Sequence, residues 1–368
     1  MTKAKMTGWL SNDNCPVIPI IYLFIPFCFL DVGFVHAGHR MGLLIGLLII
    51  LALKIPNQWL RYFLLYAAIL FLITTSSFVL ENINFFSYER KLVFDRLVFL
   101  IVGIIIYLLI LDSNTSTKWF YNVFCIGTLI QFSIALIQKC GFDPILWLFQ
   151  SIGCKAYSKL PIDIGMGSLG NNNFLAAMIA ITIPFFFRKY WIYCVPFLLI
   201  QFFSLKTSTA IISLAIGLLL YFGLSNSTCF QNIFVTIFII FFVLIYIFYC
   251  DQPIWKSPRF KYWFTIIENL WLNKKALFFG FGPKAVLPFG IKSPLHNEWL
   301  QGIYHYGVIG ISFLITYVIT ISRKNKILFV AFIIACVNAV GNYPMHLAPS
   351  AFLILIIMGL IQRESTNG

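Results

Sequence analysis

The 368-residue chain is 60% hydrophobic and only 10% charged, and its formal net charge is +14 at pH 7. Soluble domains average about 45–50% apolar and about 25% charged residues, so this chain carries more apolar surface than a water-exposed fold can bury. Alternating strands of about ten residues, which build outer-membrane barrels, do not occur in the sequence. The composition therefore predicts an all-α integral membrane protein.

Apolar runs of roughly 15–20 residues recur along the chain, and this is the length that crosses a bilayer as a helix. We predict about twelve transmembrane helices in a single polytopic domain that covers 1–368. The N-terminal run has no small-residue cleavage site, so we interpret it as a retained first helix. The predicted spans cover approximately 16–35, 41–53, 62–80, 97–111, 119–138, 173–187, 190–205, 208–224, 231–249, 298–321, 327–341 and 348–361.

Lysine and arginine mark one side of the predicted membrane domain. The short connections of the other side carry little beyond Arg40 and Lys206. By the positive-inside rule the basic side is cytoplasmic, so both termini are predicted there. The long connectors 81–96, 139–172 and 250–297 then lie on the outer face, which is the periplasm if the host is Gram-negative. The residues of the basic side are Lys3, Lys5, Lys54, Arg61, Lys118, Arg188, Lys189, Arg323, Lys324, Lys326 and Arg363.

The nine cysteines show no spacing typical of a zinc site, and most lie within apolar runs as small apolar side chains. We expect no metal. Cys140 and Cys154 share one outer connector and would form a disulfide in an oxidising compartment.

The connector 250–297 is predicted to contain an amphipathic helix. In "PRFKYWFTIIENLWLNKK" the apolar residues recur at helical spacing, opposite Arg259, Glu268 and Asn269. A helix lying on the bilayer is the simplest interpretation, and the basic excess of the loop fits anionic head groups or an anionic substrate. Nucleic acid is not expected, because the basic residues are split between two membrane faces. The apolar residues are Phe260, Trp263, Phe264, Ile267, Leu270 and Trp271.

The stretch "SPLHNEWL" begins the next apolar run. Ser293 and Pro294 are suitable as N-cap and first helical residue, which would place His296 in the first turn. There the helix dipole and nearby lysines would keep the imidazole neutral and able to accept a proton. By position alone, a general base and a structural role at the membrane interface both stay open for His296.

Two further outer-face features permit two interpretations each. Asn171, Asn172 and Asn173 precede a span as a polar cap or as hydrogen-bonding groups for a sugar or phosphate. Lys206 lies in a very short turn between two spans, where it either extends toward the head groups or binds phosphate.

Taken in order, the segments between Gly167 and Leu360 resemble the O-antigen ligase and O-antigen polymerase superfamily, which includes bacterial protein O-oligosaccharyltransferases. "SPRFKYW" is similar to the Arg-x-x-x-Trp motif of the family at Arg259 and Trp263. The chain departs from the family where "KTSTA" replaces an arginine between two middle spans, with Lys206 offset by about two positions. The other similar segments are "GSLGNNNFLAA", "FFGFGP", "HNEWLQGIYHYGVIG" and "NYPMHLAPSAFLILIIMGL".

The resemblance implies a metal-independent inverting glycosyltransferase of the bacterial inner membrane that uses no cofactor. Its active site would be periplasmic, with 250–297 as the catalytic loop. The enzyme would move a glycan from undecaprenyl-diphosphate to an acceptor hydroxyl on lipid A core, on a growing glycan or on a protein. His296 would be the base, and Arg259 would act in catalysis and, with Lys206 and Lys284, bind the diphosphate. The residues expected to orient the substrates are Asn297, Glu298, Asn173 and His346.

The chemical requirements of this reaction agree with the residues present. A glycosyl diphosphate carries its own leaving group, so its departure needs cations more than a general acid. Glycan hydrolysis needs two facing carboxylates, and the long loop offers no obvious pair. A transporter or lipid-glycan flippase is the alternative from another class, but charges gather at span ends and no internal repeat is evident. We expect Gly302, Gly307 and Gly310 to permit close helix packing, and we expect His305 to be structural.

Overall fold

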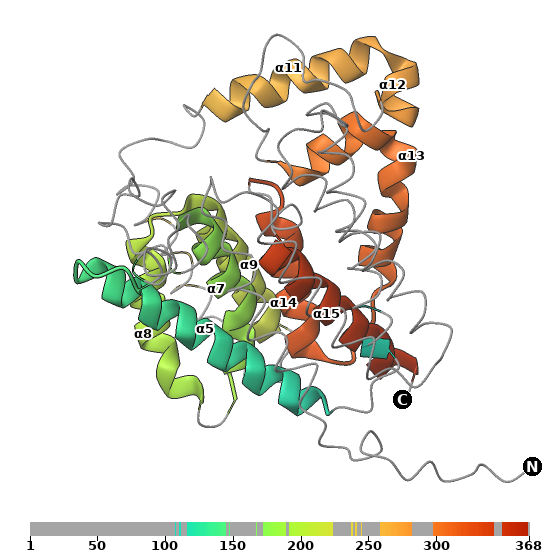
Figure 1. Ribbon diagram of the computed structural model, residues 1–368. Coiled ribbons are helices and arrows are strands. Elements are labelled where there is room, and N and C mark those ends of the chain that lie inside the picture. The colour runs from blue at the N-terminus through green and yellow to red at the C-terminus, as the bar shows by residue number, and fades with distance from the viewer. Residues whose placement is uncertain are drawn as a thin grey trace, which may run out of the picture.

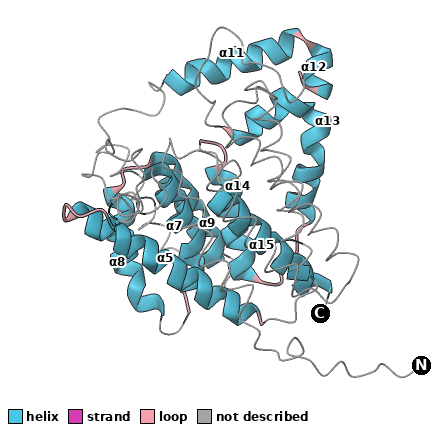
Figure 2. Cartoon of the chain, in the orientation of Figure 1, coloured by secondary structure: helices cyan, strands magenta, loops and turns pink. Residues whose placement is uncertain are grey.

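All regular secondary structure in the described part of the protein is helical, and short loops and turns join the helices (Figure 2). The computed structural model describes residues 107, 110, 111, 116–144, 147, 167, 172–188, 191–223, 237, 240, 244, 258–281, 297–341 and 348–366. The all-α prediction is therefore confirmed for these residues. The helices are α5 (Thr117–Lys139), α7 (Asn172–Phe186), η4 (Trp191–Cys194), α8 (Val195–Ser204), α9 (Ser208–Gly223), α11 (Pro258–Leu272), α12 (Lys274–Phe279), α13 (Glu298–Thr320), α14 (Lys326–Asn338) and α15 (Ala348–Thr366).

Most predicted spans in this part coincide with a helix to within a few residues. The predicted span 190–205 differs, because the 3-10 turn η4 precedes α8 there. Pro196 lies in the first turn of α8. The span 348–361 is longer than predicted, since α15 continues to Thr366. The predicted spans 16–35, 41–53 and 62–80, and most of 97–111 and 231–249, lie outside the described residues.

Helix α5 is the one helix in the described ranges that is long and apolar enough to cross a membrane. The apolar helices α7, α9 and α14, and η4 together with α8, have only 10–17 residues. A straight span needs about 20 residues. Helix length therefore leaves the predicted twelve membrane helices unconfirmed.

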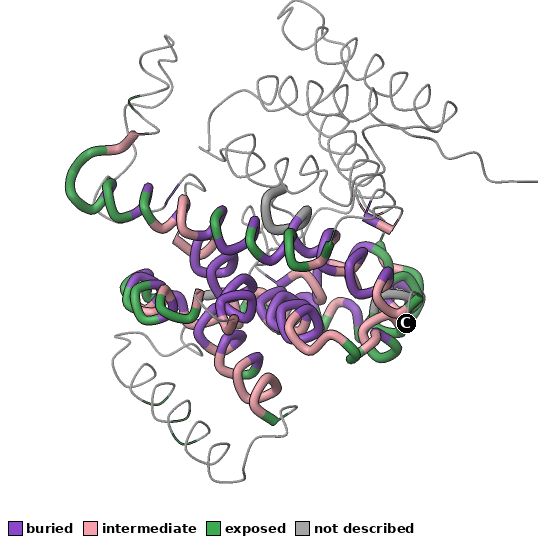
Figure 3. Tube along the Cα trace, turned by 90° about the horizontal axis from the view of Figure 1, so that it is seen from below, coloured by how far each residue is buried: buried purple, intermediate pink, exposed green. Residues whose placement is uncertain are grey.

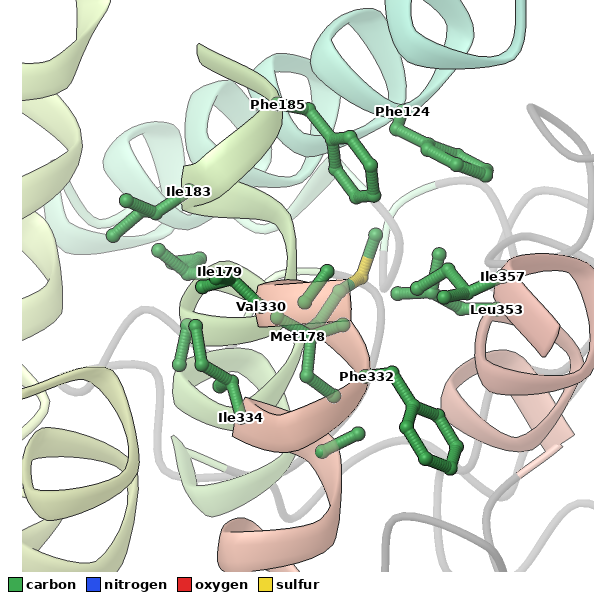
Figure 4. Packing of buried hydrophobic residues seen from close by; sticks show 14 of the residues in the cluster. Phe124, Met178, Ile179, Ile183, Phe185, Val330, Phe332, Ile334, Leu353 and Ile357 are labelled. Atoms are coloured by element: carbon green, nitrogen blue, oxygen red, sulfur yellow. The ribbon is translucent and has the colours of Figure 1, made fainter. Parts of the chain in front are cut away.

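Helix α7 is the centre of the bundle. Every residue from Leu175 to Phe186 is buried, because the helix is apolar on all sides. It contacts α5, α8, α9, α14 and α15. Figure 4 shows side chains of α7 beside those of α5, α14 and α15. The buried residues run through the middle of the bundle and exposed residues lie at its periphery (Figure 3).

Close contacts and buried hydroxyl groups fix the neighbours of α7 in place. Thr128 of α5 donates its hydroxyl proton to Thr182 of α7 at 2.9 Å, and Asn338 of α14 donates to Ser213 of α9 at 3.1 Å. Gly217 lets α9 approach α14, since a Cβ atom there would lie 2.2 Å from Ile334 Cγ1. Small and hydroxyl side chains at such contacts are typical of helices that pack in a bilayer.

The bundle has two chemically different ends. At one end, which we call the basic end, the first turn of α5 meets the last turn of α15, where Arg363 Nη2 donates to Thr117 Oγ1 at 3.1 Å. Arg188 lies over the Tyr121 ring, and Asn325 Nδ2 donates to Glu364 Oε2 at 2.6 Å. The other end is covered by α11, which lies across it (Figure 1), and we call it the α11 end. Which compartment each end faces stays a prediction.

Gly217→Ala should destabilise the bundle, because the new methyl group overlaps the side chain of Ile334. We expect a loss of about 1–3 kcal/mol, measured as a lower midpoint of thermal unfolding in detergent. Gly223→Ala is the matched control on the same helix, since no atom lies within 4 Å of its Cβ position. Equal midpoints for the two variants would contradict the close α9–α14 contact.

Candidate functional site

Helix α13 begins at Glu298, where the predicted span 298–321 begins, and not at the cap that Ser293 and Pro294 suggest. Its N-cap is Asn297, whose side chain accepts a hydrogen bond from Leu300 N at 2.9 Å, and Glu298 is the first helical residue. The predicted start at Ser293 and Pro294, with His296 inside the first turn, is therefore wrong. Asparagine is as good an N-cap as serine, so local preference did not decide between the two positions.

Tertiary hydrogen bonds select the observed start of α13. Glu298 N donates to Ala339 O at 2.8 Å, and Trp299 Nε1 donates to Cys336 O at 2.9 Å. Both acceptors are among the last carbonyls of α14, which a helix leaves without a partner of its own. The first turn of α13 is thus attached to the C-terminal end of α14.

Arg259 reaches the same end of α14 from the first turn of α11. Its Nη1 donates to Gly341 O at 3.3 Å, and the residue is half-buried. The C-terminal end of a helix carries partial negative charge, so a guanidinium is favourable at this position. The arginine that the sequence motif singles out therefore lies beside Glu298 and the end of α14.

The turn between α8 and α9 joins this cluster from the other side. Thr207 Oγ1 lies 3.3 Å from Asn173 Oδ1, at the start of α7. A Cβ atom on Gly341 would lie 2.5 Å from Thr209 Oγ1, so the start of α9 touches the chain just beyond α14. We call the residues joined in this way the candidate site: Asn173, Thr207, Thr209, Arg259, Asn297, Glu298, Ala339 and Gly341.

Lys206 adjoins the candidate site in a strained conformation. Its φ angle is +51°, and it is the one non-glycine residue with a positive φ within the described ranges. This left-handed region costs an L-residue with a β-carbon about 1–2 kcal/mol. The ammonium group is on an exposed residue next to Thr207. Strain of this kind often accompanies function, so Lys206 stays a candidate for the missing arginine.

Three predicted site residues lie outside the described residues: His296, Lys284 and His346. His296 immediately precedes Asn297 in the sequence, and therefore precedes the N-cap of α13. Their roles in catalysis and binding stay predictions.

Sequence reasoning missed Thr207, Thr209 and Gln301. Gln301 is 8% exposed, its Nε2 lies 3.5 Å from His305 Nε2, and its Oε1 is buried without a hydrogen-bond partner. Asn297, Gln301 and His305 recur every four residues, so this buried polar stripe was visible in the sequence as a helical pattern. The two threonines gave no comparable signal. His305 is buried beside Gln301, in agreement with a structural role.

Helix α13 is broken at Gly307, whose φ and ψ are 70° and 176°. A Cβ atom on Gly307 would lie 2.1 Å from Phe278 O, and one on Gly280 would lie 2.3 Å from His305 O. Phe281 N donates to Tyr304 O at 2.8 Å across the same contact. The close packing predicted for Gly307 therefore exists, but it joins α13 to the end of α12.

Cys140 is a free and exposed thiol, so it takes no part in the disulfide considered with Cys154. Cys140 is the C-cap of α5, and its backbone N–H donates to Leu136 O at 3.2 Å in the last turn of that helix. Cys154 itself lies outside the described residues.

No protein-family model matches the sequence, and no curated protein or solved structure matches it significantly. The resemblance to the O-antigen ligase and polymerase superfamily therefore rests on the order and spacing of the motifs alone.

Enlarging Gly341 and then reducing Thr209 tests the contact between these two residues in the candidate site. Gly341→Ala should lower the midpoint of thermal unfolding, because its Cβ overlaps Thr209 Oγ1 and Cγ2, at a cost of about 1–3 kcal/mol. Thr209→Ala in the same chain should restore most of the loss, since the nearest remaining Thr209 atom is Cβ at 3.2 Å. Strictly additive losses in the double variant would contradict the contact.

Proposed function

We propose that the chain is a polytopic inner-membrane glycosyltransferase that moves a glycan from undecaprenyl-diphosphate to an acceptor hydroxyl. An O-antigen ligase, with lipid A core as acceptor, or an O-antigen polymerase is the preferred form. A protein O-oligosaccharyltransferase is the alternative acceptor choice within the same chemistry.

The observation that carries the proposal is the bond from Arg259 to Gly341 O at the end of α14. Through it, α11 is attached to the same helix end that holds Glu298, and Thr209 touches Gly341 from α9. Segments that the motif order singled out over a long stretch of sequence therefore converge at one end of the bundle. Convergence of this kind is expected of a site and not of independent helix ends.

The proposed chemistry divides the charged groups into two tasks. Arg259 and Lys206 stabilise the negative charge that develops on the diphosphate as the glycosyl bond breaks. His296 removes the proton from the acceptor hydroxyl, and Asn297 and Glu298 follow it directly to orient the acceptor. The neutral state of His296 does not depend on a place within the first helical turn, because the basic residues of the loop disfavour imidazolium.

The membrane placement is supported by what the bundle exposes. Large apolar side chains face outward on α5, α8 and α13 as well as inward, for example Ile126, Ile200 and Ile319 at 39, 70 and 69% exposure. A fold in water would leave such faces unfavourably hydrated, whereas acyl chains accommodate them. In the proposed topology the basic end and both termini are cytoplasmic, and the α11 end is periplasmic.

A transporter or flippase is a second candidate, and one observation favours it. Helix α13 is interrupted at Gly307 beside the buried polar residues Gln301 and His305. Interrupted helices with buried polar groups are typical of transport sites. Arg259 and Lys206 lie at helix ends and not at the break, so glycosyl transfer remains the preferred function.

A deletion strain tests the proposed function directly through its surface glycans separated on a gel. Loss of all long glycan from lipid A is expected for a ligase, and a single repeat unit on lipid A is expected for a polymerase. Altered protein masses with normal lipopolysaccharide would indicate protein glycosylation. His296→Ala and Arg259→Ala should each fail to restore the glycan, because the base or the main diphosphate cation is missing.

The control for this experiment is Arg323→Ala. It removes an exposed arginine from the loop that follows α13, at the opposite end of that helix from Asn297. It should restore the glycan fully, and all variants must accumulate in the membrane to equal levels. Glycans that are unchanged in the deletion strain, or restored by His296→Ala, would rule out the proposed enzyme or the proposed base.

Lys206→Gly tests whether Lys206 binds the diphosphate or only extends toward the lipid head groups. Glycine adopts the φ of +51° without strain, so the thermal midpoint in detergent should stay equal or rise. Transfer from limiting undecaprenyl-diphosphate-linked glycan should fall, because one cation at the leaving group is lost. Full activity of the purified variant, or a joint fall of activity and stability, would count against the assignment.

A further inference from the structure

Helix α11 carries more apolar surface than α13 covers. Ile266 and Leu270 are 0 and 3% exposed and pack, with Ala276 of α12, against Leu300 and Tyr304 of α13. The sequence predicts one apolar face for this helix, and the structure divides that face into a covered and an uncovered part.

The uncovered part is a strip of large side chains along α11. Phe264, Ile267 and Trp271 are 68, 49 and 65% exposed. They are spaced by three and four residues and therefore lie on one side of the helix, next to the side that holds Ile266 and Leu270.

The polar residues of α11 occupy a different side. Lys261 and Glu268 are exposed and seven residues apart, so they lie above one another on the helix surface. At about 100° per residue, this side adjoins the strip of Phe264 and Trp271 and lies away from Ile266. The helix thus has one side against the protein, one exposed apolar side and one exposed polar side.

The apolar strip continues onto α12 and α13. Phe278 and Phe279 of α12 are 51 and 66% exposed, and the Phe278 carbonyl meets the backbone of Gly307. On both sides of Gly307, and farther along α13, large apolar side chains are exposed as well, with Thr316 and Thr320 exposed among them. The apolar residues are Tyr306, Val308, Ile309, Ile315 and Ile319.

Basic groups border this apolar surface. Lys274 Nζ lies 3.6 Å from the centre of the Trp271 ring, and Lys275 and Lys261 are exposed on the same two helices. Glu268 is the one acidic residue of the α11–α12 segment, so three lysines face one carboxylate. An aromatic ring with a lysine over its face is suited to the boundary between acyl chains and head groups, where one side is apolar and the other carries charge.

We propose that Phe264, Ile267, Trp271, Phe278 and Phe279 form an interfacial face that inserts into the outer leaflet of the bilayer, with Lys261, Lys274 and Lys275 among anionic phosphates. The continuity with the exposed side of α13 selects the bilayer over a protein partner, because α13 is a proposed membrane helix. The inference rests on the membrane placement in the proposed function. It adds that the bilayer itself supports the helix that carries Arg259.

Quenching of tryptophan fluorescence by brominated lipid tests the interfacial face on the full chain. The chain is placed in nanodiscs of phosphatidylcholine and phosphatidylglycerol, with or without bromine at the 6 and 7 positions of the acyl chains. The fluorescence of Trp271 is the intensity of the unaltered chain minus that of Trp271→Phe. This intensity should fall at least about twofold when the lipid is brominated. Trp263→Phe is the matched control, since Trp263 packs against the covered cluster and its contribution should change little.

A second variant pair tests the charged border. Lys274→Glu with Lys275→Glu should reduce the quenching of Trp271 in nanodiscs that contain phosphatidylglycerol, and should reduce it less in phosphatidylcholine alone. A Trp271 contribution that iodide in water quenches and brominated lipid does not would overturn the interfacial face. The interfacial face would also be overturned if neither iodide nor brominated lipid quenched Trp271 and cross-links formed between copies of the chain. Since no step reads glycan transfer, a negative result with normal transfer would overturn this inference alone.

Discussion

The arrangement of α11 and α13 depends on hydrogen bonds to the carbonyl groups at the C-terminal end of α14. A helix leaves its last carbonyls without partners, and burying them unpaired costs free energy. Here Cys336 O accepts from Trp299, Ala339 O accepts from Glu298 N, and Gly341 O accepts from Arg259. Each donor comes from α11 or α13. The carbonyl groups at the end of α14 and in the turn just beyond it therefore attach α13 and α11 to the bundle.

The same contact joins opposite partial charges. The end of α14 is negative and the beginning of α13 is positive, so their antiparallel arrangement is favourable, and Glu298 lies in the first turn where a carboxylate is stabilised. Arg259 adds a full positive charge at the Gly341 carbonyl, just beyond the negative end of α14. The guanidinium is thus held by the fold itself, and its orientation does not have to be established by a substrate.

Hydropathy was sufficient to find most helices in the described ranges, because α7, α9 and α14 are apolar along their whole length. It also placed the start of α13, since the predicted span begins at residue 298. Local cap preference did not identify the N-cap, because Ser293 and Asn297 are equally good caps and a bond to Ala339 O decides between them. The Gly307 break was also hidden, since its cause is the carbonyl of Phe278 on another helix. Local patterns contain no information on such partners.

The candidate site shows the same division. Arg259 and Asn173 were predicted from motifs, whereas Thr209 was not, because a threonine at the start of an apolar helix is common and its contact with Gly341 is remote in sequence. The periodic pattern of α11 was correct in spacing and wrong in assuming a single environment. Period alone places residues on one side of a helix, but it does not say whether protein or lipid covers that side.

Helix α11 is held at both ends by contacts to the backbone of other elements. Arg259 in its first turn binds Gly341 O, and the segment after it crosses α13 where Gly280 and Gly307 permit direct backbone contact. A helix fixed at two points can still rotate about its own axis unless its sides are supported. Ile266 and Leu270 support one side against α13. The proposed insertion of Phe264 and Trp271 into the outer leaflet supports the adjoining side. It would hold the Arg259 guanidinium at the depth of lipid phosphates, which is where the diphosphate of a polyprenyl-linked donor must lie.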